Sequence, residues 1–572
     1  MTSYIPGRGE DALFNYKRIK AHSVTIGDLE MGSDYPIRIQ SMANTNTNDT
    51  EASVEQCIRI IEAGGELVRF TAQGVREAKN LEAIREELTK RGFKQPLVAD
   101  IHFNPKAADE AALHVEKVRI NPGNYVDSVH TQKRFTYTDE EYQQEIQKIR
   151  EKLVPFLQIC KEHNTAIRIG VNHGSLSDRI LSRYGDTQQG MVESCMEFLR
   201  ICRDEQFSNI VISIKASNTV IMVETVRLLA ATMEKEGMDF PLHIGVTEAG
   251  DGEDGRIKSA VGIGALLCDG IGDTIRVSLS EAPECEIPVA QKLANYIASR
   301  SGHATIEGED SGKVNPFAYS RRKTTAIGNI GGNNVPVVIA DQLGGDLQPD
   351  YTAADIASDK KFMELTLAEL NAALPKIKSD NVLIAKSDHT NPVGELRAFI
   401  HTLLSNGKDN PVILKLGYED KQLGDFQIKA AADLGSFFID GIADGIWLSD
   451  PHIESKDVNT TAFSILQASR CRMSKTEYIS CPSCGRTLYD MQSTIAQIKA
   501  KTSHLKNLKI GIMGCIVNGP GEMADADYGY VGSGVGRVNL YKGQTCVEKM
   551  IPAEEAVDKL VQLIKDNGDW IE

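Results

Sequence analysis

The sequence has no long hydrophobic run. None of its 572 residues lie in a stretch that approaches the roughly 18–20 consecutive apolar residues of a membrane-spanning helix. The N-terminal segment MTSYIPGRGEDALFNYK lacks the apolar core of a secretory signal, and its acidic residues come too early for a transit peptide. These absences predict a protein that neither crosses a membrane nor is exported, and we expect it in the cytoplasm.

Positive charge is scarce relative to negative charge. Lys and Arg total 63 against 79 Asp and Glu, which gives a formal charge of −16 at pH 7. Non-specific nucleic-acid binding draws on clustered positive charge, so no nucleic-acid partner is expected, and a local basic cluster would indicate a specific anion. The 11 cysteines are odd in number and follow no secretory signal. This argues against a disulfide framework and leaves the cysteines available for metals.

The first 300 residues repeat a β-rich run followed by a helical stretch. The chain is too long for one hydrophobic core, so two to four domains are expected. Eight strands alternating with helices over about 250 residues predict a (β/α)8 TIM barrel in residues 1–300, rather than a doubly wound open sheet. A hairpin at 23–32 is expected to plug the N-terminal face of this barrel. The strand candidates are 36–42, 66–72, 96–103, 117–123, 166–172, 209–215, 241–249 and 274–279.

Two further domains follow the barrel. Residues 301–330 are polar and Gly-rich and are interpreted as a linker. The whole segment 301–470 is predicted to be an inserted α/β domain that resembles part of a barrel and serves as a spacer. Residues 471–572 are predicted to form a small α+β domain around a metal. The strand candidates of the inserted domain are 335–340, 381–386, 411–416 and 445–450.

Every strand of the predicted barrel ends in a polar residue, and five of the eight supply Arg or Lys. TIM barrels carry their chemistry at these C-terminal strand ends. One such cation would be interpreted as a surface ion pair, but five that converge on one mouth repel each other and need a counter-anion. Guanidinium groups match phosphate oxygens, so the expected ligand is a phosphate ester, and a diphosphate in particular. The strand-end residues assigned to this site are Arg69, Asp100, His102, Arg119, Asn121, Arg168, Asn172, Lys215, Arg276 and Ser278.

Glu248 is the carboxylate best suited to acid catalysis. It follows the apolar run HIGV and precedes Ala-Gly, which places it at the barrel mouth in a partly dry environment. Burial would raise its pKa, as a general acid requires, while a counter-ion for a neighbouring Arg is the alternative. Asp100 and His102 lie two residues apart on one strand and face the same way. Without a third partner they are expected to bind substrate hydroxyls rather than a metal.

The last hundred residues contain a cysteine pattern that predicts a metal. Cys481 and Cys484 form CPSCG, but the second CxxC pair of a zinc ribbon is missing. Cys515 and Glu522 stand seven residues apart in CIVNGPGE, whose glycines and proline can turn both side chains toward one centre. Three cysteines with one oxygen ligand suit a 4Fe–4S cluster with one exchangeable iron position. A structural zinc, completed by another Cys or His of this domain, fits the spacing equally well.

Taken together, eight segments carry a resemblance to one enzyme family. They are RIQSMANT (38–45), ADIHF (99–103), VRINPGN (118–124), RIGVNHGSL (168–176), TEAG (247–250), GIGDTIRVSL (270–279), CPSCGRT (481–487) and GCIVNGPGE (514–522). With these segments the chain resembles the 4-hydroxy-3-methylbut-2-enyl diphosphate synthase (IspG/GcpE) family of the methylerythritol phosphate pathway to isoprenoids. The resemblance covers the barrel and the C-terminal domain, and the middle segment looks like the extra domain of the family's long form.

The resemblance implies an iron–sulfur oxidoreductase that opens and dehydrates 2-C-methyl-D-erythritol 2,4-cyclodiphosphate with two electrons. Ferredoxin or flavodoxin would supply the electrons singly, and Glu248 would protonate the departing hydroxyl. The ligands of the implied 4Fe–4S cluster are Cys481, Cys484, Cys515 and the exchangeable Glu522. The implied diphosphate-binding residues are Arg69, Arg119, Arg168, Lys215 and Arg276, with Asn121, Asn172 and Ser278 in support.

The assembly and two rival interpretations stay open at this point. A monomer and a homodimer are both compatible with the sequence, and our hypothesis is that the cluster domain closes over the barrel of its own chain. One rival is a pterin-binding barrel, like that of dihydropteroate synthase, with a structural zinc ribbon. The other is a zinc-stabilised scaffold whose barrel has lost its activity.

Overall fold

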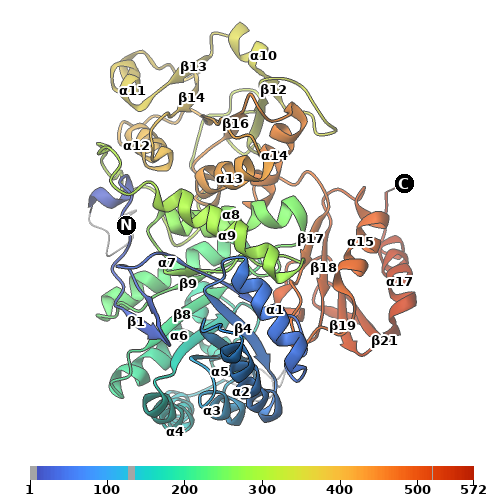
Figure 1. Ribbon diagram of the computed structural model, residues 1–572. Coiled ribbons are helices and arrows are strands. Elements are labelled where there is room, and N and C mark those ends of the chain that lie inside the picture. Colours follow the sequence, from blue (N-terminus) through green and yellow to red (C-terminus); the bar gives the residue numbers. More distant parts are fainter. Residues whose placement is uncertain (1–9, 127–135, 518, 572) are drawn as a thin grey trace.

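The first 300 residues fold around a parallel barrel in the computed structural model, which describes residues 10–126, 136–517 and 519–571 (Figure 1). The hydrogen-bonded order of the strands is β8-β7-β6-β5-β4-β3-β10-β9. The ring closes where the Ile212 N–H donates to the Pro241 carbonyl oxygen over 3.0 Å. The strands are β3 (Arg38–Met42), β4 (Leu67–Ala72), β5 (Leu97–Ile101), β6 (Lys117–Ile120), β7 (Ala166–Asn172), β8 (Ile210–Lys215), β9 (His243–Ile244) and β10 (Thr274–Ile275). The predicted TIM barrel is confirmed.

Helices alternate with these strands, and polar caps fix where several of them begin. The Asp49 side chain accepts from the Ala52 N–H at the start of the first helix, and Thr138 and Glu141 form a reciprocal capping box. The helices of this part are α1 (Thr50–Glu62), α2 (Val75–Lys90), α3 (Pro105–Ala111), α4 (Asp139–His163), α5 (Asp178–Tyr184), α6 (Gln188–Asp204), α7 (Thr219–Lys235), α8 (Gly252–Cys268) and α9 (Glu286–Ala298), with short 3-10 turns at Glu10–Leu13 and Pro283–Cys285.

The predicted hairpin covers the N-terminal end of the barrel. Strands β1 (Val24–Ile26) and β2 (Leu29–Met31) pair antiparallel. Their apolar side chains form one buried cluster with Leu67, Val98 and Ala166, which stand at or near the starts of the barrel strands. This seals the barrel at one end and leaves its C-terminal mouth for polar side chains.

The middle domain is a six-stranded parallel sheet in the order β12-β11-β16-β15-β14-β13, flanked by helices. It is the partial barrel that the sequence predicts, but with two more strands than the four expected. The two additional strands are short, at Tyr351–Thr352 and Phe362–Leu365, and carry no long apolar run that would mark them. The elements are β11 (Val337–Ala340), β12 (Tyr351–Thr352), α10 (Ala353–Ser358), β13 (Phe362–Leu365), α11 (Leu367–Ala373), a 3-10 turn (Leu374–Lys376), β14 (Val382–Lys386), α12 (Pro392–Ser405), β15 (Val412–Gly417), α13 (Leu423–Ile439), β16 (Gly445–Ser449) and α14 (Ser455–Ala468).

Helices α8 and α13 join the barrel to the middle domain (Figure 1). A Cβ atom on Gly264 would lie 2.7 Å from the Cα of Ala432, so these helices approach as closely as their backbones allow. Arg227 adds a buried ion pair with Asp269 at 2.8 Å, and a further bond to Asp440 of the middle domain. Close packing and buried charge pairing make this junction a rigid one.

The C-terminal domain is a mixed sheet that lies beside the barrel mouth (Figure 1). Its order is β17-β18-β19-β20-β21, parallel for the first three strands and antiparallel for the rest. A parallel bridge between Ala249 and Ser480 links its first strand to the loop after β9. The elements are β17 (Glu477–Ser480), α15 (Met491–Thr502), β18 (Lys509–Met513), α16 (Gly519–Glu522), β19 (Tyr528–Gly534), β20 (Arg537–Lys542), β21 (Thr545–Pro552) and α17 (Ala553–Asp566). Throughout the described residues, every helix is too short or too polar to cross a bilayer.

Candidate active site

One cavity lies where the C-terminal domain meets the barrel mouth, and both parts of the same chain line it. The barrel contributes side chains from all eight of its strands or the loops directly after them. The C-terminal domain contributes the loop after β17 and the loop after β18. The predicted residues that line the cavity are Arg69, Asp100, His102, Arg119, Arg168, Asn172, Lys215, Glu248, Arg276, Ser278, Cys481, Cys484 and Cys515.

Inward-facing glycines make room for the long cationic side chains of the barrel. A Cβ atom on Gly170 would lie 2.7 Å from the Arg119 Nε atom and 3.2 Å from the Arg168 Nε atom. A Cβ atom on Gly245 would lie 3.1 Å from the Lys215 Nζ atom. Because the interior of a TIM barrel is filled with side chains, two empty positions are needed to hold this many cations in it.

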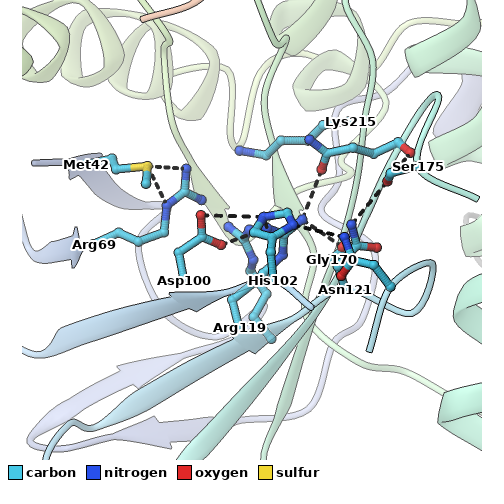
Figure 2. A network of polar contacts seen from close by, with 12 residues as sticks. Met42, Arg69, Asp100, His102, Arg119, Asn121, Gly170, Ser175 and Lys215 are labelled. Atoms are coloured by element: carbon cyan, nitrogen blue, oxygen red, sulfur yellow. Dashed lines mark hydrogen bonds and ion pairs between the residues drawn. The ribbon is translucent and has the colours of Figure 1, made fainter. Parts of the chain in front are cut away.

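Arg119 stands at the centre of a buried polar network (Figure 2). Its guanidinium donates to the Asp100 carboxylate at 2.7 Å and contacts the His102 ring. It also donates to the Gly170 carbonyl at 2.9 Å and to the Asn172 side-chain oxygen at 3.1 Å. The network fixes Arg119 in one orientation. Asp100 and His102, which we predicted to bind substrate hydroxyls, both contact this Arg and hold it in place.

Arg69 and Arg276 both contact the sulfur of Met42. The Arg69 Nε and Nη2 atoms lie 3.1 and 3.0 Å from this sulfur (Figure 2). The Arg276 Nη1 atom lies 3.6 Å from it. Arg276 is held by two bonds of 2.9 Å to the Glu286 carboxylate. Arg69 has a soft, uncharged acceptor instead, and burial lowers its pKa. Its charge is therefore poorly compensated without a ligand.

Arg168 and Lys215 share a buried histidine. The Arg168 Nη1 atom lies 3.0 Å from the Nδ1 atom of His243, and the Lys215 Nζ atom lies 3.2 Å from its Nε2 atom. His243 is fully buried in β9. Burial lowers the pKa of Lys215 well below its usual value, and Arg69 and Arg168 lower it further.

The charges around the cavity do not balance. Six basic side chains line it, the five of the barrel and Arg486 of the C-terminal domain. Asp100 and Glu286 pair with three of them, Arg119, Arg486 and Arg276. The other three, Arg69, Arg168 and Lys215, contact uncharged sulfur and imidazole atoms. This arrangement suits a ligand with more than one negative charge.

The three cysteines belong to the part of the cavity lining that the C-terminal domain contributes. Cys481 directly follows β17, and the Gly514 N–H donates to its sulfur over 3.2 Å. Burial raises the pKa of the Cys481 thiol. Cys484 and Cys515 complete the lining. In the described part of the chain, no three His, Cys, Asp or Glu side chains are gathered closely enough to hold a metal ion.

Glu522 is bound by the barrel, although it belongs to the C-terminal domain. Its carboxylate accepts from the Asn172 amide at 2.6 Å and from the Thr247 hydroxyl at 2.8 Å. Its backbone carbonyl accepts from the Ser217 hydroxyl at 2.8 Å. A Cβ atom on Gly174 would lie 2.4 Å from the Cα of Gly521, so glycine is required for this close approach of the two loops. Glu522 therefore ties the C-terminal domain to the barrel mouth.

Glu248 lies beside Glu522 in a dry part of the same region. It is 8% exposed, Glu522 is 2% exposed, and the two carboxyls share a hydrogen bond. Burial raises the pKa of Glu248, and burial together with the neighbouring charge of Glu248 raises the pKa of Glu522 well above its usual value. The Oε2 atom of Glu248 is buried without a hydrogen-bond partner. Its backbone φ of 48° lies in the left-handed region, which is uncommon for Glu.

Comparison with known proteins identifies the family. The model of the GcpE TIM-barrel domain matches residues 21–291, and the model of the GcpE protein C-terminal domain matches residues 477–566. The chain belongs to the GcpE family. Curated relatives named 4-hydroxy-3-methylbut-2-en-1-yl diphosphate synthase (flavodoxin) match it over 98% of its length. Those of Phocaeicola vulgatus and Parabacteroides distasonis are each 58% identical, and that of Porphyromonas gingivalis is 53% identical, with 100, 100 and 99% of the relative covered.

The two GcpE matches leave the middle domain uncovered, yet the relatives extend across it. The match of nearly full length therefore shows that these bacterial proteins share the inserted segment. The solved structure of Yersinia pestis dihydropteroate synthase covers 49% of the chain at 14% identity and a TM-score of 0.32, a likeness that carries no functional inference.

Two residues assigned to the site of this GcpE protein do not line the cavity. Asn121 donates to the Ser175 hydroxyl at 3.1 Å and so supports the loop after β7 from behind. Glu522 lies behind the cavity wall, held by the barrel as described above. The supporting role of Asn121 and the cluster-ligand role of Glu522 stay predictions.

Four residues near the cations or thiols were missed by the sequence analysis. Met42 lies within the first family motif and Thr247 directly before Glu248, but neither is charged. His243 lies inside the apolar run PLHIGV, which is typical of barrel core. Arg486 is the one with a usable signal, because it follows Cys484 by two residues in CPSCGRT. Its guanidinium reaches across the cavity to Asp100 at 3.2 Å.

Proposed function

We propose that this protein is a 4-hydroxy-3-methylbut-2-enyl diphosphate synthase that acts on 2-C-methyl-D-erythritol 2,4-cyclodiphosphate. In this reaction the substrate takes up two electrons and two protons, its ring opens at a carbon–oxygen bond, and one hydroxyl leaves as water. The observation that carries the proposal is the shared cavity, lined by barrel cations on one side and by Cys481, Cys484 and Cys515 on the other. The names of the relatives support the same activity.

The cations provide the binding site for the diphosphate. Arg69, Arg168 and Lys215 contact the Met42 sulfur and the His243 ring rather than carboxylates, which leaves them able to bond phosphate oxygens. Arg119 and Arg276 are held in place by Asp100 and Glu286, so they present fixed donors to the same anion. Prearranged donors cost little to organise when the ligand binds. Asn121 and Ser278 support the site, Asn121 through the loop at Ser175.

The residues on the opposite side fit a 4Fe–4S cluster. Cys481, Cys484 and Cys515 line the cavity without forming a compact metal site. A zinc ion, with Zn–S bonds of about 2.3 Å, would draw its sulfurs to one point, whereas a cluster binds each thiolate on a separate iron. Such a cluster would supply single electrons to the substrate. Glu522 is the nearby carboxylate for the fourth position, although it is bound by Asn172 and Thr247 in this structure.

Glu248 serves as the proton donor. Burial raises its pKa, which favours the protonated form that an acid needs. Its Oε2 atom is buried without a partner and is available to a leaving hydroxyl. Ser278 and His102 line the cavity and can orient the hydroxyl groups of the carbon skeleton. Closure of the C-terminal domain over the mouth excludes water from this transfer.

Flavodoxin is the proposed electron donor, because the relatives carry it in their names, and ferredoxin is the alternative. The site is complete within one chain, which supports closure by the chain's own C-terminal domain and permits a monomer as well as a homodimer. The middle domain then acts as a rigid spacer, packed on the barrel through α8 and α13. A reducing cytoplasm suits loop thiolates that hold a cluster.

Anaerobic turnover tests the proposed function. Protein prepared and reconstituted without air is mixed with the cyclic diphosphate and a strong one-electron reductant, and the product is identified by mass spectrometry. The expected product is 4-hydroxy-3-methylbut-2-enyl diphosphate, formed by wild type and lost in Cys484→Ser. Iron and sulfide analysis of the same samples provides the control. Protein that contains zinc but no iron, and that leaves the substrate unchanged, would rule the function out.

A further inference from the structure

His243 lies between two groups that are both ordinarily hydrogen-bond donors. Its Nδ1 atom is 3.0 Å from the Arg168 guanidinium, and its Nε2 atom is 3.2 Å from the Lys215 Nζ atom. An Arg side chain has donors and no acceptor, and it keeps its proton in proteins. The Nδ1 atom of His243 must therefore be the unprotonated acceptor in this contact.

The tautomer of His243 then determines the state of Lys215. A neutral imidazole that accepts at Nδ1 carries its proton at Nε2. That N–H points to the Lys215 Nζ atom, which can accept only as an uncharged amine. An ammonium at Lys215 would place its own N–H against the N–H at Nε2 of His243, and one of the two observed contacts of His243 would have to break.

We propose that His243 holds Lys215 as a neutral amine in the free protein, and that binding of the diphosphate brings one proton from solvent onto Lys215. This inference rests on the proposed function, since it assumes a diphosphate in the barrel. His243 is a positioning residue in this scheme and does not touch the ligand. The balance is simple: the amine of Lys215 gains one proton from water, becomes an ammonium, and turns from the His243 N–H to a phosphate oxygen.

The surroundings of Lys215 support the neutral form. The charged groups that act most strongly on Lys215 are Arg69 on β4, Arg119 on β6, Arg168 on β7 and Arg276 directly after β10, all of one sign. His243 is faced in addition by Lys117 of β6, whose Nζ atom is buried without a hydrogen-bond partner. Burial lowers the pKa of both Lys215 and His243 well below their usual values. A dianionic ligand reverses this balance, because its charge favours the ammonium.

The chemistry of the substrate allows the proton taken up by the protein to be measured. A phosphate monoester has a second ionisation near pH 6 that would obscure a proton taken up by the protein. In the cyclic diphosphate each phosphorus carries a single ionisable oxygen, which is strongly acidic, so the ligand itself neither gains nor loses a proton near neutral pH. Any net uptake on binding belongs to the protein.

Titration calorimetry of the full-length, anaerobically prepared protein tests the inference. The cyclic diphosphate is added without reductant, at one pH, in several buffers that differ in ionisation enthalpy. The slope of the observed enthalpy against the buffer enthalpy gives the number of protons taken up. We expect about one proton per site at pH 8, and an affinity that falls up to tenfold per pH unit as pH rises.

The variant Lys215→Arg provides the matched control, since it keeps the positive charge and cannot be neutral. We expect it to bind with close to zero proton uptake and with an affinity that no longer falls with pH. If circular dichroism shows that Lys215→Arg does not fold, the proton uptake and the pH dependence of affinity measured on wild type alone decide whether the inference holds. Wild-type binding with no proton uptake, or equal uptake by wild type and Lys215→Arg, would overturn the inference and leave the proposed function intact. Failure of the cyclic diphosphate to bind at any pH would remove the proposed function and this inference with it.

Discussion

The Asn172 side-chain amide donates a 2.6 Å hydrogen bond to the Glu522 carboxylate across 350 residues of sequence. Asn172 ends a barrel strand, and Glu522 ends the short helix α16 that follows Cys515. The same Asn172 accepts from Arg119, which lies in the centre of the cation network. One amide therefore connects the anion site of the barrel with the cysteine side of the cavity.

Removing this amide should loosen the closed arrangement. In Asn172→Ala, Glu522 keeps its bond from Thr247 but loses the bond from Asn172. Leaving a buried hydrogen-bonding group without its partner costs about 1–3 kcal/mol, so we expect kcat/KM to fall by about 5- to 100-fold. Backbone amides of residues 519–522 should exchange faster with deuterium. Asn209→Ala is the control: it removes two bonds to Thr25 at the opposite end of the barrel and should change neither quantity. Equal effects of the two variants would contradict a special role for Asn172.

Glu248→Gln should stop proton donation and preserve binding. The amide has nearly the same shape as the carboxyl, so the KM for the cyclic diphosphate should change little. General acid catalysis contributes about 10²–10⁴-fold, and kcat should fall within that range. Steady-state kinetics with a one-electron reductant measures both constants. Glu253→Gln, an exposed position five residues further along the chain, should keep the wild-type rate. A Glu248→Gln variant with full kcat would show that another group is the acid.

Arg486→Met should weaken substrate binding from the side of the C-terminal domain. The Arg486 guanidinium donates to the Asp100 carboxylate at 3.2 Å. Burial lowers the pKa of Arg486, but the nearby Cys484 and Asp100 raise it by more, so the net shift is upward. Its loss removes one of the six basic side chains around the cavity and one bond between the domains. We expect an increase of about tenfold or more in KM. Arg537→Met, an exposed change in the same sheet, is the control. An unchanged KM in Arg486→Met would place Arg486 outside the binding site.

Closure within one chain predicts the outcome of a mixing experiment. Arg168→Met removes a barrel cation and Cys484→Ser removes a thiol, so each variant alone should be inactive. If the cavity forms within a single chain, a mixture of the two contains no intact site and should stay inactive. Mixtures of either variant with wild type should show the activity of the wild-type fraction alone. Activity restored in the mixture of variants would mean that barrel and cysteines of different chains meet.

Local patterns in the sequence were sufficient for most of the fold. The eight barrel strands, the hairpin at 23–32 and the polar strand ends follow from hydrophobic periodicity and from the rule that TIM-barrel chemistry lies at C-terminal strand ends. Strands β9 and β10 have two residues each and are much shorter than predicted. After these residues the regular ladder of hydrogen bonds between neighbouring strands ends, because polar residues there turn toward the cavity. The sheet edges of the middle domain were missed because their strands are short.

The relation between the domains could not be read from the sequence. His243 was indistinguishable from a core residue, since its role depends on the Arg168 and Lys215 side chains of two other strands. Glu522 was assigned through its spacing from Cys515, yet it contacts Asn172 and Thr247 of the barrel. Such contacts depend on how whole domains pack, and neither spacing nor periodicity contains that information.

Electron paramagnetic resonance of the reduced protein, recorded with and without the cyclic diphosphate, is the most direct test that barrel cations and cysteine-bound iron act on one ligand. We predict a reduced iron–sulfur signal in protein prepared without air, a changed signal after the diphosphate is added, and no change at the same concentration in Arg168→Met. If wild type shows no iron–sulfur signal after reconstitution, or a signal that does not change when the diphosphate is added, the shared site is contradicted.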